Sequence, residues 1–206
     1  MTMLDSRYWD SRYAEADYSY GTEPNDFLVQ VAPRIPQGRV LCLAEGQGRN
    51  AVYLAGLGHL VTAVDQSAVG AQRAQRLAAE RGVRIETITA DLADFLIAPG
   101  AWEGIVSIFG HLPPALRADV HHRVVAGLRP GGTFVLEAYS PRQVHFGTGG
   151  PRAGQEELLV PLSSVAAELG GLRLERAAEV EREVREGSYH HGRSSVVQVL
   201  GFKPTD

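Results

Sequence analysis

The stretch VLCLAEGQGRNAVYLA (residues 40–55) joins an apolar run to an apolar-periodic segment through a loop that holds Gly46 and Gly48. Glycine at such a junction allows the backbone to approach a ligand or a neighbouring element closely. Asp65 and Asp91 end the next two apolar runs. Carboxylates at strand ends can bind a ribose or an adenine amino group. The spacing indicates a loop for a nucleotide or nucleoside cofactor, or a turn that only packs tightly on the next helix.

A sheet whose strands end on one side must hold these residues. Apolar or alternating runs predict strands at residues 39–44, 59–65, 83–91, 102–110 and 133–140. Periodic segments predict helices between them at residues 49–58, 67–82 and 114–132. Ser67 can cap the second of these helices, and Gly82 can end it. This alternation predicts an α/β, Rossmann-like fold with a mostly parallel sheet and helices on both faces.

After the last of these strands the pattern changes. Residues 141–157 predict a long loop rich in glycine and proline, which could act as a hinge over a substrate or be a plain connection. Residues 162–169 predict a short helix, and residues 179–202 predict two strands around the turn GSYHHG. Residues 178–184 also fit a helix, but we favour a strand because their apolar side chains share one strand face.

The composition limits the class of protein. The chain has 206 residues, enough for one α/β domain with a buried core, with 44% apolar and 21% charged residues. A net charge of −4 argues against a nucleic-acid partner bound through a basic face. The single cysteine, Cys42, allows no internal disulfide, and neither a thiolate cluster nor a His-x-x-x-His spacing predicts a metal site. Without a signal peptide or an apolar stretch of about 18 residues, we expect a cytoplasmic protein with no membrane partner.

The glycine loop suits more than one cofactor. Gly46, Gly48 and Ala51 match the Gly-x-Gly-x-x-Ala form of the dinucleotide fingerprint, whereas a Gly-Lys-Ser/Thr phosphate loop is absent from the sequence. A short-chain NAD(P) reductase would need Tyr-x-x-x-Lys, but Val199 precedes the single lysine, Lys203, at that spacing. The chain also has no room for a separate substrate domain. We therefore favour S-adenosylmethionine over NAD.

Nearly the whole chain resembles the class I methyltransferases. The segment LRPGGTFVLEAY followed by two strands resembles the end of that fold, which implies seven strands in the order 3-2-1-4-5-7-6 with the seventh antiparallel. The segment LCLAEGQGRNAVYLAGLGHLVTAVDQS resembles the motif of the tellurite-resistance branch. Where the usual family motif reads DLGCG, Cys42 replaces the acid and Ala44 replaces the first glycine. Glu45 adds a new acid in the loop.

This resemblance implies a set of cofactor-binding residues. Asp65 would bind the ribose together with the next residue, and Asp91 would hold the adenine together with the residue that follows it. Glu45 would hold the methionine amino group, and backbone after the fourth strand would face the methionine end. Solvated helix caps are the alternative for both aspartates. The predicted residues are Trp9, Tyr20, Gly21, Glu45, Gly46, Gly48, Asn50, Asp65, Gln66, Asp91, Leu92, Ile108 and Phe109.

Aromatic residues are dense before the first strand. Trp9 and Tyr13 are four residues apart and share one helix face, so this segment could be a packing helix. It could also be a lid, since aromatic faces attract a sulfonium cation and a lid excludes water. The sequence YGTEPN resembles the segment that closes over the cofactor in related methyltransferases. We predict one domain over residues 1–206, with a lid in 1–34 and the sheet core in 38–206.

Histidines are the candidates for the acceptor side. Methyl transfer is an in-line displacement that needs a base only if the acceptor carries a proton. His111 follows the fourth strand, and His190 and His191 lie in the closing hairpin, where at most one of them can face the pocket. We predict His111, His191 and Arg193 as catalytic residues; an exposed or structural role is the alternative for each histidine.

These observations together predict an S-adenosylmethionine-dependent methyltransferase acting on a small acceptor, such as a chalcogen oxyanion or a thiol-like compound. We expect a monomer or homodimer. The alternatives are a non-catalytic S-adenosylmethionine-binding regulator and, less favoured, an NAD(P)-binding reductase.

Overall fold

A computed structural model describes residues 4–15, 17–151 and 153–205. Residues 1–3 and 16 of the predicted lid therefore lie outside the described residues. The helices are α1 (Ser6–Ala14), α2 (Asp26–Val31), α3 (Arg49–Gly56), α4 (Ala68–Glu80), α5 (Pro114–Gly127) and α6 (Leu162–Glu168). The strands are β1 (Arg39–Leu43), β2 (Leu60–Asp65), β3 (Glu86–Thr89), β4 (Trp102–Ile108), β5 (Leu128–Tyr139), β6 (Arg173–Glu186) and β7 (His190–Phe202). Short 3-10 helices cover Ala32–Arg34, Pro141–His145 and Glu156–Leu158.

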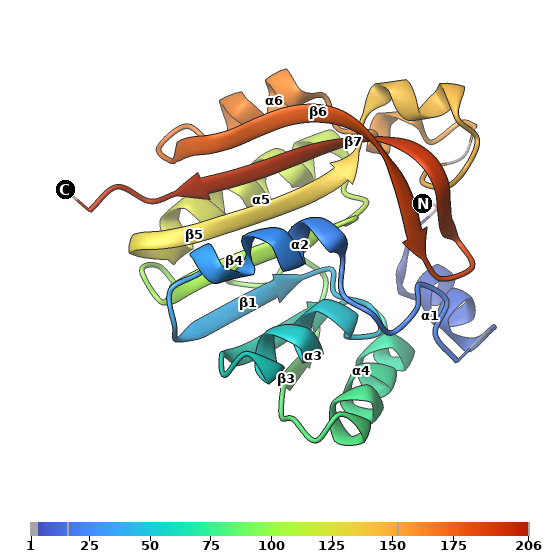
Figure 1. Cartoon of the computed structure of the whole chain (residues 1–206), viewed down its shortest axis with the longest axis horizontal. Helices are drawn as coiled ribbons and strands as arrows, with labels where there is room; N and C mark the ends of the chain where they lie inside the picture. Colours follow the sequence, from blue (N-terminus) through green and yellow to red (C-terminus); the bar gives the residue numbers. More distant parts are fainter. Residues whose placement is uncertain (1–3, 16, 152, 206) are drawn as a thin grey trace.

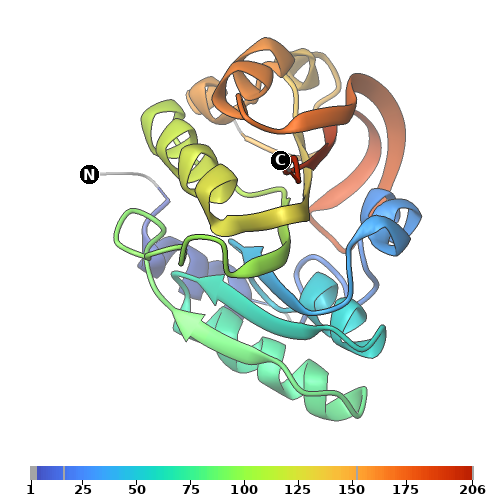
Figure 2. The same cartoon turned by 90° about the vertical axis from the view of Figure 1, so that its left-hand side faces the viewer.

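The strands form one sheet in the order β3-β2-β1-β4-β5-β7-β6, as predicted (Figure 1). The strands β1 to β5 run parallel to one another, and β7 is antiparallel to both of its neighbours, β5 and β6. Parallel strands need crossover connections, so helices must cover both faces. Figure 2 shows helices on either side of the sheet.

Strand alternation divides the core into two layers. Val40 and Cys42 of β1 pack with residues of α2, α3 and α4, whereas Leu41 and Leu43 pack with residues of α5 and α6. Successive side chains of a strand point to opposite faces, so an unbroken apolar run fills both layers. This explains why the central strands read as continuous apolar runs.

Most predicted boundaries agree with the structure within a few residues. The side chain of Ser67 accepts a hydrogen bond from the Gly70 amide and so caps α4, as predicted. The interpretation of residues 178–184 as a strand is confirmed, since they lie within β6. The predicted helix at 114–132 is too long: α5 ends at Gly127, and the Pro-Gly-Gly segment already belongs to β5.

The β6–β7 hairpin bends over the carboxyl ends of the parallel strands and meets the chain's N-terminal segment near α1 (Figure 1). The Ser188 amide donates to the Ser19 carbonyl over 3.0 Å. A Cβ added at Gly187 would lie 2.4 Å from the Gly21 nitrogen, so the two backbones touch. Segments about 170 residues apart therefore close one end of the molecule together.

A buried ionic cluster holds this hairpin in place. The Glu137 carboxylate, which is fully buried, pairs with Arg182 of β6. Glu186 pairs with both Arg182 and Arg49 at the start of α3. The Asn25 side chain donates to Glu137 over 2.7 Å and to Glu186 over 2.8 Å. Removing one member of such a cluster leaves a buried charge unpaired, which is strongly destabilising. The cluster therefore keeps β5, β6, α3 and the N-terminal segment in one fixed arrangement.

Among the described residues, no helix is both long and apolar enough to cross a membrane. In the same part of the chain, no group of three or more His, Cys, Asp and Glu side chains is arranged to hold a metal ion.

Candidate active site

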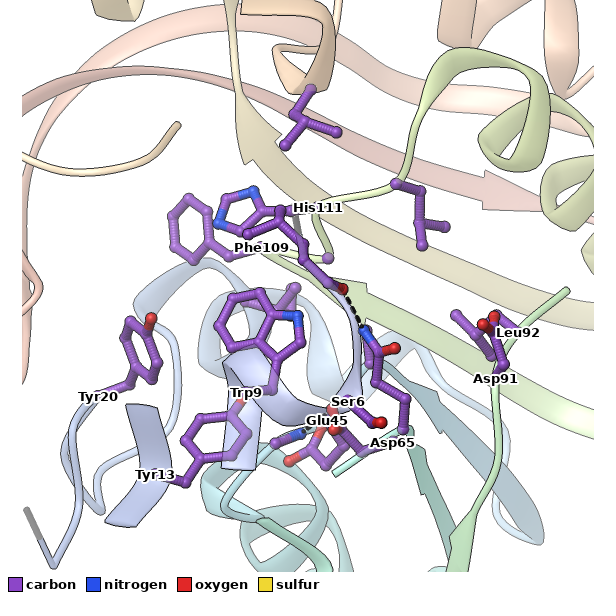
Figure 3. A pocket seen from close by; sticks show the side chains of 18 of the residues that line it. Ser6, Trp9, Tyr13, Tyr20, Glu45, Asp65, Asp91, Leu92, Phe109 and His111 are labelled. Carbon is purple, nitrogen blue, oxygen red and sulfur yellow. Dashed lines mark hydrogen bonds between the residues drawn. The ribbon is translucent and has the colours of Figure 1, made fainter. Parts of the chain in front are cut away.

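A cavity of about 610 Å³ lies at the carboxyl ends of β1, β2 and β4 (Figure 3). The β1–α3 loop, the residues after β2, β3 and β4, helix α1 and the start of β7 line it. The strand order reverses between β1 and β4, and ligands of open α/β sheets bind at this point.

The two loop glycines have different neighbours. Gly46 has φ 63° and lies in the cavity lining, and a Cβ added there would lie 2.5 Å from the Tyr13 hydroxyl. Gly48 has φ 90° and lies outside that lining, and an added Cβ would lie 2.5 Å from Cβ of Ala74 in α4. The predicted cofactor contact at Gly48 therefore needs correction: this glycine lets α3 and α4 pack closely.

The new acid of the loop, Glu45, caps a helix at the cavity wall. Its Oε1 accepts hydrogen bonds from the amides of Asn50 over 3.0 Å and Ala51 over 2.8 Å, in the first turn of α3. Gly48, the N-cap residue of α3, has no side chain for this task. Burial raises the pKa of Glu45 to about 7, while the two amides oppose that shift. Glu45 is thus a carboxylate close to its titration point at neutral pH.

Asp65 ends β2 and anchors the same loop. Its Oδ2 accepts from the Gly46 amide and its Oδ1 from the Ser67 amide, both over 2.8 Å. Burial raises the pKa of Asp65 to about 6 despite these bonds. Two carboxylate oxygens offer about four acceptor sites, so Asp65 can still accept hydrogen bonds from a ligand.

The predicted adenine residues lie across the cavity from Tyr20 in Figure 3. Leu92 is buried, whereas Asp91 is exposed and its Oδ1 accepts from the Ala93 amide over 2.8 Å. This bond closes a turn and is not the helix cap given as the alternative, since the next element after Asp91 is β4. Gln66 also lines the cavity, and its side chain donates to the Leu4 carbonyl over 3.0 Å.

Helix α1 covers the cavity with aromatic side chains (Figure 3). The Trp9 ring stacks on Tyr13 at 5.6 Å and on His111 at 6.0 Å between centroids. The Asp10 carboxylate accepts from the Ser67 hydroxyl and from the Val69 amide, so it ties α1 to the start of α4. A carboxylate at a helix N-terminus also interacts favourably with the helix dipole. The predicted Tyr20 and Gly21 line the cavity beside this helix.

The residues after β4 form the far wall. Ile108 and Phe109 are buried and line the cavity, and Phe109 has an unusual φ of 53°. His111 lines it too, and burial lowers the pKa of His111 to about 4.

The structure corrects the prediction for the hairpin. His190 lies in the lining of this cavity, whereas His191 is exposed and lines only an adjoining cavity. Arg193 is exposed and pairs with Glu181 on the surface. Neighbouring strand residues point to opposite faces, and of the two histidines His190 is the one that meets Tyr20, at 4.5 Å between ring centroids.

The lining residues that sequence reasoning missed include Tyr13, Arg49 and His190. Tyr13 was left out of the predicted cofactor-binding residues, although its spacing from Trp9 already placed both rings on one face. Arg49 lines the cavity while it pairs with Glu186. No local signal distinguishes Arg49 from a solvated helix residue, because its partner is 137 positions away. His190 was considered, but its neighbour was chosen.

Residues 40–132 match a family model described as a methyltransferase domain. No curated protein matches the sequence. The fold is similar to a solved structure from work on conversion of a disulfide bond into a thioacetal group during echinomycin biosynthesis (17% identity, 98% of this chain and 93% of that chain, TM-score 0.76). It is also similar to TehB from Haemophilus influenzae (18%, 96% and 66%, TM-score 0.73). A third similar structure is a SAM-dependent methyltransferase from Methanosarcina mazei (15%, 86% and 98%, TM-score 0.68).

The matched segment spans β1 to β5 and contains the glycine loop, Asp65 and Asp91. The domain match and the sheet order confirm the predicted methyltransferase fold and enzyme class.

Proposed function

We propose that this S-adenosylmethionine-dependent methyltransferase transfers its methyl group to a small acceptor of the thiol-like or chalcogen oxyanion class. One observation carries the proposal: a cavity of about 610 Å³, bordered by α1 and the hairpin, that is lined by Glu45, Asp65 and Asp91 and by aromatic side chains. Cavities of this size suit small molecules. The resemblance of the glycine loop to the tellurite-resistance branch supports the chalcogen class.

The lining suggests how the cofactor lies. Asp65 and Gln66 would accept and donate hydrogen bonds at the ribose, and Asp91 and Leu92 would flank the adenine on the side away from Tyr20. Glu45 would pair with the methionine ammonium group, since its Oε1 is held by α3 while the carboxylate stays at the cavity wall.

The methyl group would then point to the wall of Ile108, Phe109 and His111. Trp9 and Tyr20 would cover the sulfonium, because aromatic faces attract a cation held away from water. Residues 1–34 would act as a lid over a single domain. Helix α1 would exclude water while Gly21, at the contact with the hairpin, leaves room for the two backbones to meet.

Methyl transfer needs little from the protein beyond correct placement of the acceptor next to the methyl group. The sulfonium is already activated, so the chain supplies alignment of the acceptor with the methyl–sulfur bond and removal of water. Backbone at Phe109 faces the cavity in a strained left-handed conformation, which supports a constrained position close to the reacting centre.

Titration calorimetry with S-adenosylhomocysteine and with NAD tests the cofactor site. We expect binding of S-adenosylhomocysteine and none of NAD. Methyl transfer from labelled S-adenosylmethionine to selenite, tellurite and a set of small thiols then tests the acceptor class. Binding without transfer to any member of the set would contradict the proposed acceptors, and binding of NAD alone would contradict the site.

A further inference from the structure

A second cavity of about 620 Å³ adjoins the first. It lies between α1, the loop after β5 and the tip of the β6–β7 hairpin. The two cavities share side chains, and the shared ones include Trp9, Tyr20, His111 and His190. These side chains form a wall common to both cavities, and the reacting end of a molecule in the second cavity must pass beside them to contact the cofactor methyl group directly.

The shared wall is aromatic. His190 lies 4.8 Å from Phe109 and 6.4 Å from His111 between ring centroids, in edge-to-face geometry. Tyr20 lies against His190 on the other side, at 4.5 Å. Such a wall suits an acceptor whose reacting end is neutral, because the shared side chains offer an anion no cation in return for its lost hydration; Arg12 lines the second cavity but not this wall.

His190 has a free nitrogen at this wall. The side chain is 5% exposed, and its Nδ1 has no hydrogen-bond partner among the described residues. Buried polar atoms are nearly always paired, so an unpaired nitrogen on a side chain that lines both cavities indicates a partner supplied by a ligand. His111 differs, because Trp9 and Tyr139 stack on its two faces and fix it as part of the wall.

We propose that the acceptor occupies the second cavity, reacts through a protonated thiol, and gives its proton to Nδ1 of His190. This inference rests on the proposed function. The acceptor S–H bond breaks and its proton moves to Nδ1, while the acceptor sulfur forms a bond to the methyl carbon. The bond from that carbon to the sulfonium breaks, and its electron pair neutralises the cofactor sulfur. His190 thus acts as a catalytic base from the tautomer that carries its hydrogen on Nε2.

The charges around His190 agree with this role. Burial and the nearby groups His111, Arg49, Arg182 and Arg12 keep the pKa of His190 well below its ordinary value, so the ring is neutral before the reaction. Tyr20 and Tyr139, the other titratable groups against the ring, are neutral as well because burial raises the pKa of both. The step moves one positive charge from the sulfonium to the imidazole without adding another to the buried wall. The loss of the sulfonium charge therefore offsets the cost of charging His190.

The test uses phenylmethanethiol, a thiol that is mostly protonated at pH 7, with His190→Asn. His122→Asn is the matched control, because His122 is exposed on α5. We expect His190→Asn to lower kcat/KM at pH 7 by roughly 10²–10⁴-fold, the usual contribution of a general base, while S-adenosylhomocysteine still binds. The control variant should resemble the wild type.

The pH profile separates a base from a structural residue. In His190→Asn, kcat/KM should rise about tenfold per pH unit toward the thiol pKa, because only the ionised thiol then reacts. The wild type should show a much weaker rise. Equal pH profiles for the two proteins would overturn the proposal. If His190→Asn does not fold, the pH profile of the wild type tests the proposal. A rise in the wild-type kcat/KM of about tenfold per pH unit would also overturn the proposal that His190 acts as a base.

The acceptor class is tested in the same assay. Methylation of phenylmethanethiol without methylation of selenite supports the proposal. Methylation of selenite alone would overturn it and leave the proposed function standing. Failure of the wild type to bind S-adenosylhomocysteine would instead show that the proposed cofactor site is wrong.

Discussion

Glu45→Gln removes one negative charge from the cofactor cavity and keeps an oxygen that can cap α3. The Oε1 atom of Glu45 accepts from two amides of that helix, and a glutamine oxygen can accept the same bonds. The variant therefore separates the charge of Glu45 from its capping role. Glu157→Gln is the matched control, since Glu157 is an exposed carboxylate that lines the same cavity.

The expected loss of affinity follows from the lost ion pair. A hydrogen bond to a charged group is worth about 1.5–3 kcal/mol, which is roughly a 10- to 150-fold change in Kd. Both S-adenosylmethionine and S-adenosylhomocysteine carry the ammonium group, so both should lose affinity. The control should change the affinity of either ligand by much less.

The pKa of Glu45 provides a second test, in which its contribution to stability and the affinity for the cofactor change with pH in opposite directions. Burial raises this pKa from 4.5 to about 7, so the folded protein binds the proton more tightly than the unfolded chain. Glu45 should therefore contribute to the free energy of unfolding without ligand an amount that falls as pH rises from 4.5 to 7, by at most about 3 kcal/mol. The lowered pKa of His111 acts in the opposite direction over this range, so the Glu45 contribution is measured as the difference between the wild type and Glu45→Gln. Cofactor affinity should rise over pH 6 to 8, because the cation needs the ionised carboxylate, and Glu45→Gln should flatten that rise.

Calorimetry in buffers of different ionisation enthalpy measures the accompanying proton release. At pH 7 the wild type should release about half a proton on binding, because about half of Glu45 is still protonated there. Equal affinity and equal proton release in the wild type and Glu45→Gln would refute the assigned role of this carboxylate.

Asp65→Ala should weaken S-adenosylhomocysteine binding by about 10- to 100-fold and also lower Tm, because two buried amides lose a charged acceptor; calorimetry and thermal unfolding measure both effects. Asp91→Ala should weaken binding with little change in Tm, since that side chain is exposed, and a large drop in Tm would contradict this. In Gly48→Ala, the left-handed backbone conformation alone should cost roughly 1–2 kcal/mol of stability. The added Cβ also collides with α4, so the total loss should be larger, and an unchanged Tm would count against the packing role of Gly48. Asp10→Asn should speed hydrogen exchange in α1 without ligand, and unchanged exchange would show that this carboxylate does not hold the helix in place.

The sequence was sufficient to predict most of the strands and helices and the acidic residues at the strand ends. Apolar runs, periodic segments and cap residues are local signals, and each reports on its own element. Asp65 and Asp91 could be predicted because a residue that ends a parallel strand lies at the ligand edge of the sheet. The end of α5 was misjudged because a Pro-Gly-Gly segment usually stops a helix, whereas here β5 begins before it by pairing with β4.

Only the tertiary structure decided which residues of the outer segments face the cavity. Both faces of β7 are buried, as Val196 and Val197 show, so strand alternation could not choose between His190 and His191. The choice depends on how the hairpin tip meets Tyr20, about 170 residues away in the chain. Gly48 likewise fits a cofactor motif, yet its Cβ position is filled by α4. Contacts between segments that are distant in the chain produce no hydrophobic periodicity in either segment. The residue pattern of each segment reflects only its own helix or strand geometry, so the pattern does not reveal which segments meet.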